Sequence, residues 1–178
     1  ELTATVTEQM EAYNLTHAVR ALGDFIIDDL SNWYVRRSRD RFWGSGDSQD
    51  TRAAFATLHR SLSDVARLAA PFAPFLSDWL HRALSGGESA HLSRMPVPDE
   101  TLRDPGLERG MEAVRALSTL GRAARERVRV RVRQPLEVLY PVVPNAADVS
   151  EDLLEILRDE LNVRRVEFML RAEELVTF

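Results

Sequence analysis

Arginine and aromatic side chains alternate between residues 30 and 43, and both types can bind a nucleic acid. Four arginines and one aspartate give residues 36–41 a local charge of +3. The side chains concerned are Arg36, Arg37, Arg39 and Arg41, with Trp33, Tyr34, Phe42 and Trp43 among them. Guanidinium groups bind phosphates through paired hydrogen bonds and aromatic rings stack on bases, so the composition of this segment suits RNA without by itself predicting RNA binding. The alternative is a core helix that ends in a solvated basic turn.

A second basic island, residues 121–133, holds six arginines and one glutamate, a charge of +5. Its last part alternates valine with arginine, which predicts a strand with Val128, Val130 and Val132 facing a core. The arginines opposite would stand about 6–7 Å apart, similar to the phosphate spacing of an RNA strand; the alternative is a merely solvated face. Because the whole chain carries −5, the rest must carry −13, and the two islands favour a localised phosphate contact.

The sequence shows no pattern typical of catalysis or metal binding. Asp28 and Asp29 are adjacent, so on a helix they point about 100° apart, which is poor geometry for shared acid–base chemistry. The histidines are scattered without a helical i, i+4 pair, and there is no cysteine. We therefore expect no catalytic residue, no metal and no cofactor within these residues.

Several amphipathic segments must position the two islands. The longest, residues 16–40, carries an apolar stripe of Val19, Leu22, Ile26, Leu30 and Trp33. Arg37 falls in the phase of that stripe, so its role is ambiguous. Further helices are predicted over residues 1–13, 48–69, 74–86 and 104–126. Phe75 and Trp79 lie in a dense apolar patch, and with Trp33 they are predicted core residues.

The chain changes character after residue 126. A short strand over residues 136–143, a helix over 150–161 and a strand over 166–170 predict a right-handed crossover. We expect a mainly α protein, with an antiparallel bundle of about five helices in residues 1–126. Residues 127–178 are expected to form a small α/β appendage, the start of a C-terminal region. Gly121 predicts close helix packing or close approach of a ligand.

Three segments resemble the anticodon-binding domain of isoleucyl-tRNA synthetases. The first is Asn32 to Arg39, Asn-Trp-Tyr-Val-Arg-Arg-Ser-Arg, followed by Arg-Phe-Trp at 41–43. The second is Pro-Phe-Ala-Pro-Phe at 71–75, and the third is Val-Arg-Gln-Pro-Leu at 132–136. The resemblance runs from about Tyr13 to Phe168. The first segment alone would also fit the valyl and leucyl enzymes.

The resemblance implies a parent enzyme that joins isoleucine to its tRNA with ATP and magnesium. The family's His-x-Gly-His and Lys-Met-Ser-Lys-Ser motifs are not in this sequence, and none of its 23 basic residues is lysine. We therefore expect no catalysis by these residues. The resemblance further implies that the partners are tRNA and the catalytic domain of the same polypeptide, in a cytoplasmic monomer without membrane contact. Any zinc would lie elsewhere in the parent.

The expected tRNA contacts come from both islands. They are Arg36, Arg37, Arg39, Arg41, Trp43, Arg122, Arg125, Arg129, Arg131 and Arg133. In an up-and-down bundle the two islands could lie at one pole and form a single surface. The rival interpretation is a helical scaffold or protein-interaction module whose islands only keep it in solution.

Overall fold

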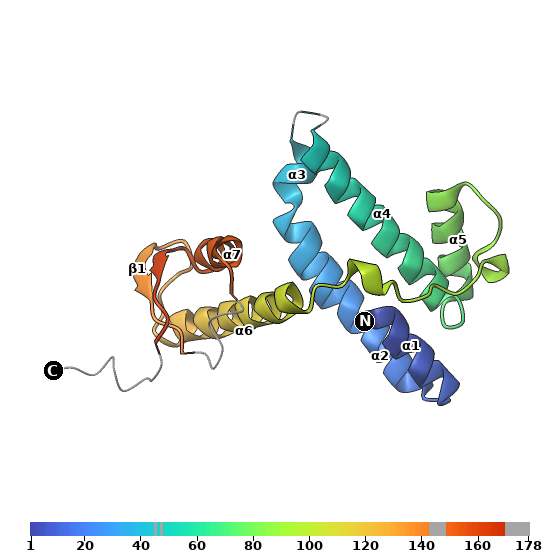
Figure 1. Cartoon of the computed structure of the whole chain (residues 1–178), viewed down its shortest axis with the longest axis horizontal. Coiled ribbons are helices and arrows are strands. Elements are labelled where there is room, and N and C mark those ends of the chain that lie inside the picture. Colours follow the sequence, from blue (N-terminus) through green and yellow to red (C-terminus); the bar gives the residue numbers. More distant parts are fainter. Residues whose placement is uncertain (45, 47, 143–148, 170–178) are drawn as a thin grey trace. The chain divides into compact units, whose positions relative to one another are not determined.

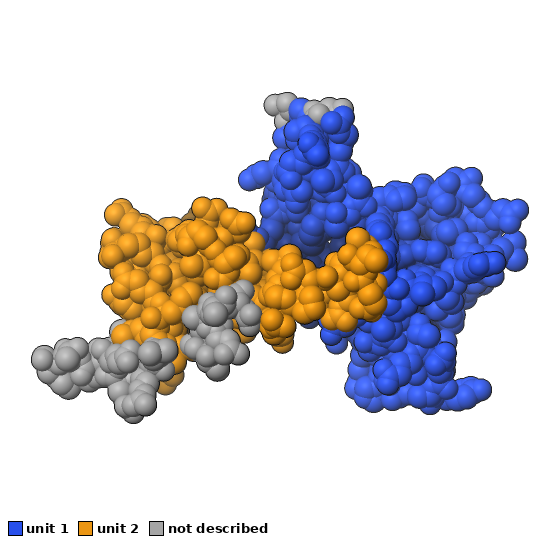
Figure 2. Space-filling model, in the orientation of Figure 1, with its two compact units in different colours: residues 1–99 blue, residues 100–178 orange. Residues whose placement is uncertain are grey.

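The computed structural model describes residues 1–44, 46, 48–142 and 149–169. By its contacts the chain divides into two compact units, residues 1–99 and residues 100–178 (Figure 2). The boundary predicted after residue 126 differs from this division, because the last long helix of the predicted bundle packs on the helix of the α/β segment. Each unit buries its own set of apolar side chains.

Unit 1, residues 1–99, is built from helices joined by turns (Figure 1). They are α1 (Leu2–Glu11), α2 (Leu15–Asp24), η1 (Phe25–Val35), α3 (Arg39–Trp43), α4 (Gln49–Ala69), α5 (Pro74–Ser85) and η2 (Ala90–Leu92). Local signals explain several ends. The hydroxyl of Ser48 accepts from the Thr51 N–H at 3.0 Å, Pro74 opens α5, and Gly86 at a φ of 63° ends it. The core lies between α1, α2 and α4 and includes Val6, Ala18, Leu22, Val65 and Leu68.

The segment that leads into the first basic island continues α2 as a π-helix. η1 spans 11 residues, and its i→i+5 bonds make side chains drift from the 100° spacing used for prediction. The buried positions are Leu30 and Ser38, the latter 4% exposed, whereas Arg37 is only half-buried. Tyr34 donates a hydrogen bond to the Ala54 carbonyl oxygen at 2.9 Å. Ser38, and not Arg37, therefore continues the core face of this helix.

Phe75 and Trp79 are 90% and 66% exposed on α5, so their prediction as core residues was wrong. α5 packs on α4 through the face that carries Ser77, which is buried. The carbonyl of Leu84, seven residues further along the same face, is 3.1 Å from a ring nitrogen of His59 in α4. Phe75 and Trp79 each stand two residues from Ser77, about 200° around the helix, and so lie on the opposite face.

Asp78 accepts three hydrogen bonds, two of which tie α5 to η2 and one of which lies within α5. Its Oδ1 accepts from the Ser89 hydroxyl at 2.5 Å and from the Ala90 N–H at 2.9 Å, and its Oδ2 accepts from Arg82 Nε at 2.8 Å. The bond from Ser89, followed by the bond from Arg82, favours the charged carboxylate and holds the pKa of Asp78 well below its usual range.

Asp78→Asn is expected to lower the free energy of unfolding at pH 7 and to have a smaller effect in acid. A carboxyl group with a depressed folded-state pKa stabilises the fold above its unfolded pKa of about 3.9, and this contribution is lost as the pH falls toward the folded-state pKa. Urea unfolding between pH 7 and pH 2.5 should show the difference between wild type and variant shrinking below about pH 4. Asp28→Asn, at an exposed carboxylate, is the control. A difference that stays constant over this range would contradict the prediction.

Unit 2, residues 100–178, combines a long helix with a strand–helix–strand segment (Figure 1). Its elements are η3 (Glu100–Leu102), α6 (Pro105–Arg127), β1 (Leu136–Leu139), α7 (Glu151–Leu161) and β2 (Val163–Val166). The strands pair in parallel, with Leu136 opposite Val163 and Leu139 opposite Val166. The predicted class, a helical protein with a small α/β appendage, is confirmed. β2 begins before its predicted position, and Leu170, predicted within it, lies outside the described residues.

Residues 128–134 form a loop, so the strand predicted from alternating valine and arginine is wrong. Val128, predicted to face a core, is exposed. The backbone carbonyls of Arg131 and Gln134 accept hydrogen bonds from the side chain of Arg125, and not from a neighbouring strand. A side chain outside the alternating segment therefore decides its backbone conformation.

Gly121 lets α6 approach α7 closely, which confirms the predicted close helix packing. A Cβ atom at this position would lie 2.7 Å from Leu161 Cδ2 and 3.2 Å from Leu161 Cγ. Leu161 is buried, and a close-packed core leaves its side chain little room to move aside.

Gly121→Ala is expected to destabilise the chain by about 1 to 2 kcal/mol. Overpacking a core costs roughly 1 to 3 kcal/mol, and the better helix propensity of alanine offsets up to about 1 kcal/mol of this. Gly23→Ala in α2 is the matched control, because a Cβ there would meet nothing within 4 Å. Urea unfolding measures both variants, and equal stability of the two would show that α6 and α7 have room to adjust.

Candidate nucleic-acid interface

An exposed aromatic cluster lies where α3 meets α4. Phe42 of α3 and Phe55 of α4 have ring centroids 5.0 Å apart, and Trp43 packs edge-on against Phe42 at 6.3 Å. Trp43 is 74% exposed and Phe55 is 49% exposed. We call Phe42, Trp43 and Phe55 the aromatic cluster. An exposed ring is a surface on which a nucleic-acid base can stack.

Three arginines of the first island hold their guanidinium groups over tryptophan rings, and one of these rings belongs to the aromatic cluster. Arg36 and Arg37 lie 5.9 and 5.7 Å from the ring centroid of Trp33, and Arg39 lies 6.0 Å from that of Trp43. Trp33, predicted in the core, is half-buried. Arg36 and Arg39 are exposed. A guanidinium stacked on a ring is held in place while its N–H edge can still bind a phosphate.

Arg41, a predicted tRNA contact, is used within the fold. Its Nε and Nη2 donate to Oδ2 and Oδ1 of Asp50 at 2.8 and 2.7 Å, and Nη2 also reaches the Asp50 carbonyl oxygen at 3.2 Å. The hydrogen bonds to Asp50 raise the pKa of Arg41. This paired geometry ties α3 to the first turn of α4 and leaves the charge of Arg41 neutralised.

Arg122 and Arg125 of the second island are also used within the fold. Arg122 pairs with Glu160 of α7, whose side chain is 2% exposed. Arg125 is 5% exposed, and its guanidinium donates to four backbone carbonyl oxygens. Our sequence reasoning missed Glu160. Its position on the buried face of α7 with Leu153 and Leu157 was the available signal, because a carboxylate there needs a partner.

The remaining arginines of the second island are exposed. Residues 128–134 are called the arginine loop below, and Arg129, Arg131 and Arg133 belong to it. Within the described part of the chain no carboxylate forms an ion pair with these three side chains. The predicted contacts that are exposed are thus Arg36, Arg39, Trp43, Arg129, Arg131 and Arg133. Three lie in each unit, and a single RNA surface made by both islands stays a prediction.

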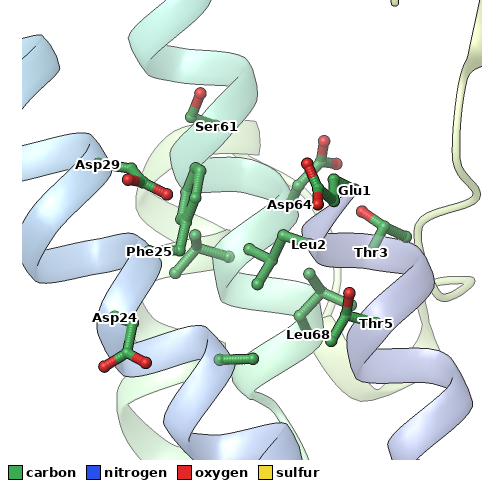
Figure 3. Close-up of a pocket in the computed structure, with 12 residues that line it drawn as sticks. Glu1, Leu2, Thr3, Thr5, Asp24, Phe25, Asp29, Ser61, Asp64 and Leu68 are labelled. Carbon is green, nitrogen blue, oxygen red and sulfur yellow. The ribbon is translucent and has the colours of Figure 1, made fainter. Parts of the chain in front are cut away.

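A pocket between α1, the α2–η1 helix and α4 has the wrong charge for a nucleic acid (Figure 3). It has a volume of about 420 Å³, and its wall carries the carboxylates of Glu1, Asp24, Asp29 and Asp64, which would repel phosphate. Among the residues described, no group of three or more side chains could hold a metal ion. None of the helices in the described ranges combines the length and apolarity needed to cross a bilayer.

The known proteins to which this chain is similar are tRNA ligases. The family described as "Anticodon-binding domain of tRNA ligase" matches residues 1–140. The chain is 42% identical over 187 residues to the isoleucine–tRNA ligase of Thermus thermophilus, covering 100% of this chain and 18% of that protein. It is 44% identical over 181 residues to the ligase of Deinococcus radiodurans, covering 100% and 17%, and 46% identical over 165 residues to that of Thermobifida fusca, covering 91% and 16%. The chain therefore spans less than a fifth of the length of these relatives.

Proposed function

Because this chain belongs to the family of anticodon-binding domains of tRNA ligases, we propose that it is the part of an isoleucine–tRNA ligase that binds the anticodon stem and loop. The observation that carries the proposal is the exposed pair of Arg39 and Trp43, with the guanidinium 6.0 Å from the ring centroid, together with exposed Phe55, which Phe42 links to Trp43. This arrangement places a cation and two ring faces within reach of one stretch of RNA.

The two kinds of side chain have different tasks in the proposed complex. Arg36 and Arg39 bind phosphates, which gives affinity and salt dependence without reading sequence. Trp43 and Phe55 take a base from the anticodon loop, where unpaired bases can stack on aromatic side chains. Because the chain carries a net charge of −5, attraction is confined to the basic islands, and a general coating of RNA is disfavoured.

The proposal extends to the whole protein. Its catalytic domain, elsewhere in the same polypeptide, would use ATP and magnesium to join isoleucine to the tRNA that this part holds. The proposed specificity of the parent enzyme for isoleucine rests on the names of the relatives. The proposed tRNA partner rests on the same names. We further propose that the whole protein is a monomer and works in the cytoplasm.

The test is a salt titration of tRNA binding by the chain. The wild type should bind a transcript with an isoleucine anticodon, and its affinity should fall steeply with salt. Arg36→Ala and Arg39→Ala should each flatten the salt slope by about 0.7 to 0.9, one phosphate contact each. Arg20→Ala, at an exposed arginine of α2 outside both islands, is the control and should leave the slope unchanged.

Two outcomes would contradict the proposal. If the wild type shows no salt-dependent binding of the transcript, the interpretation as a helical scaffold is favoured. If Arg36→Ala and Arg39→Ala stay folded and bind like Arg20→Ala, the first island only solvates its helix and does not contact RNA.

A further inference from the structure

Arg125 is a buried cation that donates to four neutral backbone carbonyl groups among the residues that the structure describes. Its Nη1 donates to the carbonyl oxygens of Arg131 and Gln134, both at 3.0 Å, and its Nη2 donates to those of Leu161 and Asn162 at 2.6 and 3.2 Å. In the part of the chain that the structure describes, no carboxylate pairs with it. The guanidinium thus joins the arginine loop to the end of α7.

The backbone of the arginine loop is held at several further points. The Val130 N–H donates to the Arg125 carbonyl oxygen at 2.9 Å, and the side-chain Nδ2 of Asn162 donates to the Val132 carbonyl oxygen at 3.0 Å. Arg129 has a φ of 57°, a left-handed conformation that marks a sharp turn. The side chain of Arg125 binds the carbonyl oxygens of Arg131 and Gln134, one before and one after Val132. The loop backbone is thus held on both sides of Val132.

The arginine side chains of the loop are exposed and form no ion pair among the residues that the structure describes. Arg129, Arg131 and Arg133 are exposed, whereas the neighbouring Arg165 of β2 pairs with Glu137 at 3.7 Å and with Glu167 at 3.1 Å. Arginines presented from a fixed backbone lose less conformational entropy on binding than arginines on a mobile chain. Guanidinium groups bind phosphates in paired geometry, so closely spaced arginines of this kind suit a phosphodiester backbone.

We propose that the arginine loop binds the phosphate backbone of the bound RNA, and that Arg125 and Asn162 are positioning residues that shape the loop without touching RNA. The inference rests on the proposed function and deepens it. In this inference, unit 2 binds RNA through phosphate contacts that do not depend on the RNA sequence. Arg129, Arg131 and Arg133 make these contacts. The sequence predicted that Arg125 contacts tRNA directly. In this inference Arg125 acts indirectly, by shaping the arginine loop.

The experiment measures binding of the tRNA transcript by the 178-residue chain over a range of salt concentrations. The triple variant Arg129→Ala/Arg131→Ala/Arg133→Ala should lose at least tenfold in affinity at low salt and flatten the salt slope by about 2 to 3. Arg125→Lys keeps the net charge and every exposed arginine, yet it should lose several-fold in affinity because lysine cannot hold four carbonyl groups in the fork geometry. Added to the triple variant, Arg125→Lys should cause little further loss.

A milder variant covers the case in which Arg125→Lys fails to fold. Asn162 has a φ of 48°, so Asn162→Gly removes the bond to the Val132 carbonyl while keeping the left-handed conformation accessible. It should lower affinity in the wild-type background and not in the triple variant. Far-ultraviolet circular dichroism and urea unfolding confirm that each variant is folded under the binding conditions.

The outcomes separate this inference from the proposed function. Wild-type binding together with unchanged affinity of the triple variant overturns the arginine loop as a binding site. Wild-type binding with a weakened triple variant, but with unchanged affinity of folded Arg125→Lys and Asn162→Gly, overturns the positioning role. Absence of salt-dependent binding by the wild type overturns both the proposed function and this inference.

Discussion

Arg122→Ala is expected to destabilise the chain by about 3 kcal/mol, through Glu160 and not through any loss of RNA contact. Removing one partner of a buried ion pair costs about 3 to 5 kcal/mol, because the other charge is left in a poorly solvated site. The lower value of this range applies here because the side chain of Arg122 is 41% exposed. Water can therefore partly solvate Glu160 once the guanidinium of Arg122 is removed. Urea unfolding at pH 7 measures the change.

A second substitution tests whether the charge of Glu160 is the cause. In the Arg122→Ala background, Glu160→Gln removes the uncompensated charge and should recover a large part of the lost stability. Failure to recover any stability would mean that Arg122 acts by packing. If Arg122→Ala stays within about 0.5 kcal/mol of the wild type, as is usual for a surface substitution, Arg122 would return to the list of RNA contacts.

Trp43→Ala is expected to weaken tRNA binding by about 1 to 3 kcal/mol, roughly 5- to 150-fold in affinity, with little change in stability. Stacking of a base on an aromatic side chain has this magnitude, and the alanine also removes the ring beneath Arg39. Trp43 is largely exposed, so its truncation should change the free energy of unfolding by no more than about 0.5 kcal/mol. Titration of the tRNA transcript and urea unfolding measure the two effects.

Trp79→Ala is the matched control for this prediction. Trp79 has a similar exposure to Trp43 but lies on α5, outside both basic islands. Its loss should leave tRNA affinity unchanged, whereas Trp43→Phe should retain most of the wild-type affinity because a ring remains. Equal weakening by Trp43→Ala and Trp79→Ala would show that exposed tryptophans bind RNA without specificity, and the aromatic cluster would lose its assigned role.

The ends of α4, α5, α6 and α7 could be predicted because their causes are local. Asp104 accepts hydrogen bonds from the N–H groups of Gly106 and Leu107 at 3.0 Å, and it begins α6 as expected from an aspartate before a proline. A glycine within the helical pattern at position 121 indicated close packing, although the sequence does not show that its neighbour is Leu161. In such cases the residue itself, or one a turn away, carries the physical reason, and the periodicity of a single segment is sufficient.

The sequence by itself determined the helices, the strand–helix–strand order and the position of two basic islands. Only the tertiary structure decided which arginines of these islands can meet an RNA. Arg41 is paired with Asp50, Arg122 is paired with Glu160, and the buried guanidinium of Arg125 donates to carbonyl groups that include that of Leu161. These partners lie six or more residues away along the chain, beyond the reach of a single helical turn, so no local pattern indicates them. The alternation of valine and arginine misled for the same reason: a strand needs a neighbouring strand to bond its backbone, and here Arg125 bonds that backbone instead.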